Sequence, residues 1–132
     1  MKLEIEFPHP DEILSPNTQV PLTLRGARVH NIKKVKAKKK ARENAFLRAL
    51  AATLSLPQRN FPAREFDVTW YYKGPRPDID NVVARLKPLI DGCSKAFGIN
   101  DRDLELGKTR RVHTLGEKAG TLVLSFSTEL QP

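Results

Sequence analysis

The sequence contains a single cysteine, Cys93, among 132 residues, so the chain cannot form an internal disulfide bond. It contains no stretch of roughly 18 apolar residues of the kind that crosses a membrane. Its first residues, Met1-Lys2-Leu3-Glu4, do not begin a secretory signal. We therefore expect a soluble protein of the reducing cytoplasm.

Acidic residues are few relative to basic ones. The 15 Asp and Glu residues stand against 23 Lys and Arg residues, which gives a formal net charge of +8 and an isoelectric point near 9.9. This excess favours an anionic partner, above all nucleic acid. Hydrophobic residues make up 39% of the chain, which predicts a folded protein, and its length predicts one domain spanning residues 1–132.

Four segments predict β-strands. Residues 2–7 and 65–72 alternate polar and apolar side chains, as half-buried strands do. Residues 104–113 and 121–128 predict two more strands, with a hairpin loop between them. The first strand is ended by Pro8 and Pro10, and the hairpin loop contains Gly116 and Gly120. The second strand has one apolar face, which consists of Phe66, Val68, Trp70 and Tyr72.

Two segments predict helices. The first runs over residues 31–56, from Asn31 as N-cap to a stop at Pro57, and the second runs over residues 81–97 to Gly98. Residues 11–30 are rich in turn formers and predict an irregular loop, with a short extended piece at residues 20–24 as one option. The order β-α-β-α-β-β indicates an α+β fold with two main helices packed on a small mixed sheet.

The second helix has two contrasting faces. At 100° per residue, Asp80, Lys87 and Asp91 lie in one narrow sector, which we expect to face solvent or a cleft. Pro88 predicts a kink, because its ring clashes with the carbonyl of Ala84. The opposite, apolar face is expected to pack against the sheet and consists of Val82, Val83, Leu86, Leu89, Ile90, Cys93 and Phe97.

Asp78 and Asp80 form a D-x-D pair in a cationic chain. Carboxylates suit hard cations such as Mg²⁺, and a basic surface suits a polyanion, so the pair is a candidate metal site. The alternative is structural: Asp80 as a helix N-cap and Asp78 as a turn residue. Asp101 and Asp103 are likewise either ligands or ordinary loop residues.

Residues 25–48 contain ten Lys or Arg residues and one acidic residue, Glu43. These cations cannot all face one side of a helix, so some of them are simply solvated. Their number nevertheless favours contact with DNA phosphates, to which Arg76 would add. The candidate DNA-binding residues are Lys33, Lys34, Lys36, Lys38, Lys39, Lys40 and Arg76.

The chain as a whole resembles the RusA family of Holliday junction resolvases, bacterial and prophage endonucleases that cut four-way DNA junctions. The resemblance begins with Ile5-Glu6-Phe7-Pro8-His9-Pro10, a strand ending in a proline-rich turn, and continues through the basic helix. It is most specific in Asp78-Ile79-Asp80-Asn81, in Lys87 with Asp91, and in Gly98-Ile99-Asn100-Asp101-Arg102-Asp103. Two positions depart from the family pattern. In the family, a lysine commonly lies four residues after the second aspartate, whereas this chain has Ala84 there and Lys87 three residues further on. The acidic pair of the family is Asn100-Asp101 in this chain.

The resemblance implies a Mg²⁺-dependent endonuclease, with Mn²⁺ as a second option, that acts on four-way junctions as a homodimer in a bacterial or prophage-encoded setting. Asp78, Asp80 and Asp101 would hold the metal, and Lys87 would stabilise the transition state. Asp91 would orient Lys87, bind a water beside the metal, or be an exposed helix charge. The alternatives are a basic DNA-binding protein without catalysis and an inactive family member.

Overall fold

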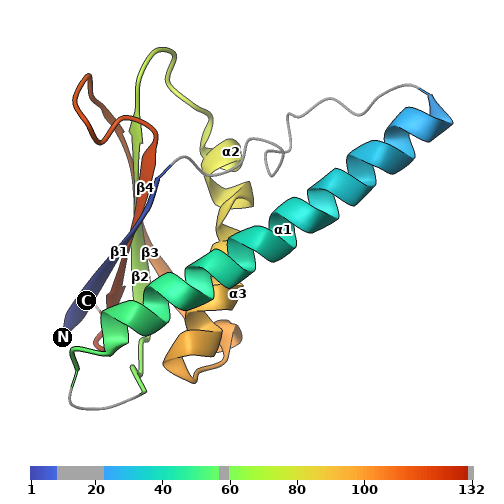
Figure 1. Cartoon of the computed structure of the whole chain (residues 1–132). Helices are drawn as coiled ribbons and strands as arrows, with labels where there is room; N and C mark the ends of the chain where they lie inside the picture. Colours follow the sequence, from blue (N-terminus) through green and yellow to red (C-terminus); the bar gives the residue numbers. More distant parts are fainter. Residues whose placement is uncertain (9–22, 57–59, 131–132) are drawn as a thin grey trace.

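The computed structural model describes residues 1–8, 23–56 and 60–130. Within these ranges the fold is α+β, with helices packed on a mixed four-stranded sheet, as the sequence predicts (Figure 1). The elements along the chain are β1 (Lys2–Pro8), α1 (Leu24–Thr53), β2 (Glu65–Tyr72), α2 (Ile79–Ala84), α3 (Leu86–Phe97), the 3-10 turn η2 (Asp101–Asp103), β3 (Glu105–His113) and β4 (Thr121–Ser127).

The strands lie in the order β1-β4-β2-β3. β4 is antiparallel to both β1 and β2, whereas β2 and β3 are parallel. The predicted hairpin between β3 and β4 is therefore wrong, because β2 lies between them. The connection passes the end of β2, where the backbone N–H of Thr114 donates to the carbonyl of Tyr72 and that of Gly120 to the carbonyl of Tyr71.

Burial explains this strand order. The first four residues of β4, Thr121 to Leu124, are all buried, so this strand needs neighbours on both sides. β3 is exposed along most of its length, which suits an edge strand. The apolar face predicted for β2 is confirmed for Phe66, Val68 and Trp70, which belong to the core, while Tyr72 is partly buried at its margin.

The first helix begins earlier than predicted. α1 starts at Leu24, and the Thr23 hydroxyl caps it by accepting a hydrogen bond of 3.0 Å from the N–H of Gly26. Asn31 is therefore not the N-cap, and residues 23–30 are not a loop. The helix ends at Thr53, near the predicted end. The predictions for Pro10, for residues 11–22 and for Pro57 lie outside the described residues.

The second predicted helix consists of two helices that meet at Arg85. Pro88 has no N–H to donate to the carbonyl of Ala84, so the hydrogen-bond ladder is interrupted where α2 ends. Pro88 instead lies in the first turn of α3, where a missing N–H costs little. The predicted apolar face is buried except for Val83, which is 43% exposed and lies 100° around α2 from the buried Val82. Gly98 ends α3 with φ 74°, as predicted.

The core lies between the sheet and the helices. Phe97 of α3 meets Phe126 of β4 edge to face, with ring centroids 4.9 Å apart. Cys93 and Ala45 are fully buried where α3 crosses α1. Figure 1 shows α1 crossing the front of α3, with its N-terminal part, in blue, extending beyond the rest of the described structure. No helix in these described ranges is long and apolar enough to cross a lipid bilayer.

Candidate functional site

Asp78 and Asp80 lie at the start of α2, where the loop that follows β2 enters the helix. Asp78 occupies the N-cap position with extended backbone angles, φ −66° and ψ 146°, but its side chain makes no capping hydrogen bond. Asp80 lies in the first turn, so the alternative in which it caps the helix is wrong. Both residues are exposed, and neither carboxylate pairs with any other described residue. Neither side chain therefore has the structural role of a cap.

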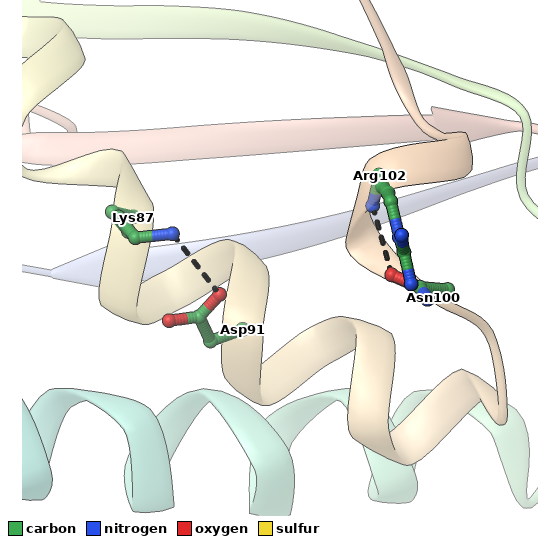
Figure 2. Close-up of polar contacts among 4 residues, drawn as sticks. All are labelled: Lys87, Asp91, Asn100 and Arg102. Atoms are coloured by element: carbon green, nitrogen blue, oxygen red, sulfur yellow. Dashed lines mark hydrogen bonds and ion pairs between the residues drawn. The ribbon is translucent and has the colours of Figure 1, made fainter.

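Lys87 and Asp91 lie one turn apart on α3. The Nζ of Lys87 is 3.9 Å from the Oδ1 of Asp91, and Figure 2 shows the two side chains facing each other along the helix. The Lys87 side chain is 79% exposed and that of Asp91 is 31% exposed. The ammonium group is therefore held loosely by Asp91 and remains accessible to an anion.

Asp91 also contacts Asp101 of η2. Burial raises the pKa of Asp91 above its ordinary value, and the side-chain hydrogen bond and negative charge of Asp101 raise it further. The positive charges of Lys87 and Arg42 lower this pKa but do not cancel the rise. The charge of Arg42 acts on Asp91 from α1, so carboxylates and cations from α3, η2 and α1 come together here.

The turn that carries Asp101 is held by its own side chains. The Oδ1 of Asn100 accepts a hydrogen bond of 3.1 Å from the N–H of Arg102, which fixes the start of η2 (Figure 2). A shallow pocket of about 390 Å³ lies beside Asp91 and Asp101. Ser94 lines it, and its buried hydroxyl has no hydrogen-bond partner among the described residues. Asp103 is exposed, and its carboxylate forms no ion pair with another described residue.

The structure tests whether these residues suit a divalent metal. Within the described part of the chain, no three His, Cys, Asp or Glu side chains form a group that could hold a metal ion. The predicted set of Asp78, Asp80 and Asp101 is thus not gathered as one group, and Asp101 is instead paired with Asp91. Mg²⁺ often takes only one or two carboxylates and keeps its waters, so the Asp91–Asp101 pair fits such an ion.

The candidate DNA-binding cations lie mainly on α1. Lys34 is half-buried, whereas the other predicted lysines and Arg76 are exposed. Lys34, Lys38 and Arg42 follow one another at intervals of four residues, so each is turned by about 40° from the one before and all three lie within roughly 80° on one side of the helix. Because the Arg42 charge acts on Asp91, this side of α1 faces the carboxylates. Lys33 and Lys36 lie roughly 140–160° away from Lys38.

A second group of side chains surrounds Trp70, and sequence reasoning missed it. The guanidinium of Arg85 lies over the Trp70 ring, 5.2 Å from its centroid. Arg111, which is paired with Trp70 in the sheet register, donates a hydrogen bond of 3.0 Å to the carbonyl of Pro77. This bond fixes the residue that precedes Asp78. The mixed charge of residues 73–80 was the available signal, but the stacking on Trp70 depends on the helix break at Arg85.

No protein-family model matches the chain. The chain is similar to an uncharacterized protein from Xylella fastidiosa (strain Temecula1 / ATCC 700964), with 39% identity over 105 residues. The aligned region covers 74% of this chain and 60% of that relative, so the chain spans about three-fifths of the relative's length. The name of the relative states no activity, and the proposal below therefore rests on the residues of this chain.

Proposed function

We propose that the protein is a Mg²⁺-dependent, structure-selective DNA endonuclease that resolves four-way junctions by paired symmetric cuts in recombination and repair. The observation that carries the proposal is the meeting of carboxylates with a basic helix. Asp91, Asp101 and Lys87 lie together within the influence of Arg42, on the lysine-rich helix α1. A nuclease needs this combination, because cations must hold the DNA next to the carboxylates that hold the metal.

Asp78, Asp80 and Asp101 are the proposed ligands for Mg²⁺ or Mn²⁺, and Asp91 is the partner of Asp101. The described residues do not gather these carboxylates into one group, so an ion would be held by only one or two of them and by water. When bound, such an ion would polarise the phosphate and lower the pKa of a bound water. The exposure of Asp78 and Asp80 supports their role, since carboxylates that pair with no other described residue are available to a cation. The fit is also chemical, because oxygen donors are what hard divalent cations prefer.

Lys87 is the proposed electrostatic stabiliser of the phosphate undergoing cleavage. Its ammonium group lies 3.9 Å from Asp91 and its side chain is mostly exposed, so it can contact an incoming phosphate without a large rearrangement. The lysines of α1, together with Arg76, contact neighbouring phosphates. Such contacts position the duplex arms but carry no sequence information.

Paired cuts require two active sites related by symmetry, and a two-fold homodimer supplies them. The proposed assembly is therefore a homodimer bound to a four-way junction in the cytoplasm. Sedimentation of the purified protein at micromolar concentration tests this part separately, and we expect a mass twice that of the 14.9 kDa chain.

A basic DNA-binding protein without catalysis is the second candidate, and an inactive relative of the resolvases is a variant of it. One observation favours them: the described residues contain no group of three metal-ligating side chains. In this case the lysines of α1 would bind DNA in the same way, but the carboxylates would serve only to shape the surface charge.

The deciding experiment incubates the full chain with a labelled four-way junction and a matched duplex, with and without Mg²⁺. We expect symmetric nicks in the junction alone, dependent on the metal. Asp80→Asn should abolish cutting while the junction still binds, and Glu117→Gln, an equal loss of charge at an exposed site between β3 and β4, should leave cutting unchanged. Failure to cut several junction sequences with either Mg²⁺ or Mn²⁺ would favour the DNA-binding protein without catalysis.

A further inference from the structure

Arg85 is a partly buried cation that has no anionic partner among the residues that the structure describes. Its guanidinium lies over Trp70, and its Nε is buried without a hydrogen-bond partner among the described residues. None of the described carboxylates forms an ion pair with it. A guanidinium carries five N–H donors, and leaving a buried one unsatisfied is costly. The described residues therefore leave hydrogen-bonding capacity on this cation that an anionic ligand could satisfy.

A pocket of about 390 Å³ opens beside Arg85, between the end of β2 and the loop that follows it. Trp70 and Tyr72 give it aromatic walls, and Lys73 adds a second cation. Pro77, which also lines it, is held in place by the hydrogen bond from Arg111. Among the described residues that line this pocket, none is acidic. Its chemistry therefore suits an anion attached to a flat or apolar group.

The position of this pocket narrows the choice of anion. Pro77 is followed directly by Asp78, the first proposed metal ligand, so an anion in the pocket would lie next to the proposed reaction site. A simple packing role accounts for the stacking of Arg85 on Trp70, but not for a buried Nε without a partner. A nucleotide unit satisfies both walls of the pocket, because its phosphate pairs with guanidinium and its base stacks on aromatic rings.

We propose that the pocket between Trp70, Lys73 and Arg85 binds a phosphodiester group of the DNA, next to the phosphodiester that is cut. Arg85 donates hydrogen bonds to the phosphate oxygens, and Trp70 fixes the plane of the guanidinium. The identity of the ligand as DNA rests on the proposed function. The anion site itself rests only on Arg85 and the side chains around it.

Trp70 is the only tryptophan in the chain, so its fluorescence reports occupancy of this pocket directly. The experiment titrates the full chain with an unlabelled four-way junction in Ca²⁺ buffer, and separately with a thymidine dinucleotide that carries one phosphodiester. We expect the emission of Trp70 to change with both. Arg85→Gln should weaken junction binding by about tenfold, as for the loss of one charged hydrogen-bonding group. The slope of log K against log salt concentration should also become shallower by about one.

Arg64→Gln is the matched control. Arg64 is exposed just before β2, and eight residues of extended chain separate it from Tyr72, or roughly 26 Å. This variant should bind as the unaltered protein does. Arg85→Lys should be intermediate, because it keeps the charge but loses the planar fork. Circular dichroism and thermal unfolding show whether each variant is folded, and if Arg85→Gln is not, Lys73→Gln replaces it with the same expected direction.

The outcomes separate this inference from the proposed nuclease activity. A Trp70 response that depends on Arg85, without any cutting, supports the pocket and overturns the nuclease. Normal cutting and binding by a folded Arg85→Gln protein overturns the pocket and leaves the nuclease intact. If neither DNA changes the Trp70 emission, the pocket binds no phosphodiester and the proposal is wrong.

Discussion

The carboxyl groups of Asp91 and Asp101 lie against each other, although one belongs to the middle of α3 and the other to the turn after it. Gly98 makes this contact possible. With φ 74° it lets the N–H of Ile99 bond to the carbonyl of Ser94, which ends the helix and turns the chain back. Two carboxyl groups are thereby held close together, which contributes to the raised pKa of Asp91.

Asp91→Asn should weaken cutting without weakening the fold. The raised pKa of Asp91 means that its ionised form is less stable in the folded protein than in water, so an uncharged side chain removes a cost. We expect the melting temperature at neutral pH to be unchanged or higher by up to about 3 °C. Junction cutting should fall by about 10- to 100-fold, as for the loss of a residue that orients a ligand.

Glu117→Gln serves as the control for this substitution, because Glu117 is an exposed carboxylate in the loop between β3 and β4. Glu117→Gln should change neither the melting temperature nor the rate of junction cutting. Calorimetry gives the melting temperature and a gel assay gives the cutting rate. A drop of several degrees in Asp91→Asn would mean that the Lys87 ion pair outweighs the repulsion, and that Asp91 is a structural residue.

Gly92→Ala should strongly destabilise the protein. A Cβ at this position would clash with the carbonyl oxygen of Arg42 and lie 2.9 Å from the backbone nitrogen of Phe46, so α1 would have to move. Overpacking against backbone atoms costs roughly 1–3 kcal/mol or more, and we expect at least about 2 kcal/mol in the free energy of unfolding measured with urea. Gly116→Ala is the control, since its Cβ would meet only the Thr114 hydroxyl, at 3.5 Å. An equal loss in both variants would contradict the close crossing.

The fold was predictable where one local pattern decides it. β2 was predicted with its observed bounds, because alternation and a following proline-rich loop agree. The start of α1 was not predictable in the same way, since Thr23 and Asn31 are both acceptable N-caps and residues 24–30 have little apolar periodicity. Strand order depends on which strand must be buried on both faces. This is a property of the whole sheet, so the glycines between β3 and β4 could not show that β2 separates those strands.

The candidate site was predictable only in part. The acidic residues were identified from the sequence, but their grouping depends on geometry that spacing does not give. Treating residues 81–97 as one helix aligned Asp80 with Lys87 and Asp91, whereas in the structure Asp80 belongs to α2 and the other two belong to α3. Asp101 could not be paired with Asp91 from the sequence, because the path of the chain after Gly98 depends on its packing against α3.

Cys93 should be unreactive in the folded protein. Burial raises the pKa of its thiol to about 12, and its Sγ lies 3.9 Å from the carbonyl oxygen of Ala45, on the adjacent helix. Since the thiolate is the reactive form, we expect reaction with a disulfide reagent at pH 8 to be at least about 100-fold slower than in urea. The urea sample is the control and should give one thiol per chain. Rapid labelling without denaturant would mean that α1 and α3 separate readily.

The two sides of α1 should differ in their importance for DNA. Lys34 and Lys38 share a side with Arg42, which acts on Asp91, whereas Lys33 and Lys36 point away from the carboxylates. Replacing Lys34 and Lys38 with Gln should make the slope of log K against log salt concentration shallower by about two. It should weaken junction binding by about tenfold near 0.1 M salt. Replacing Lys33 and Lys36 with Gln removes the same charge and should weaken binding less than about threefold. Fluorescence anisotropy over a range of salt concentrations measures both. Equal losses would mean that α1 attracts DNA only through its total charge, and that the strand need not pass the carboxylates.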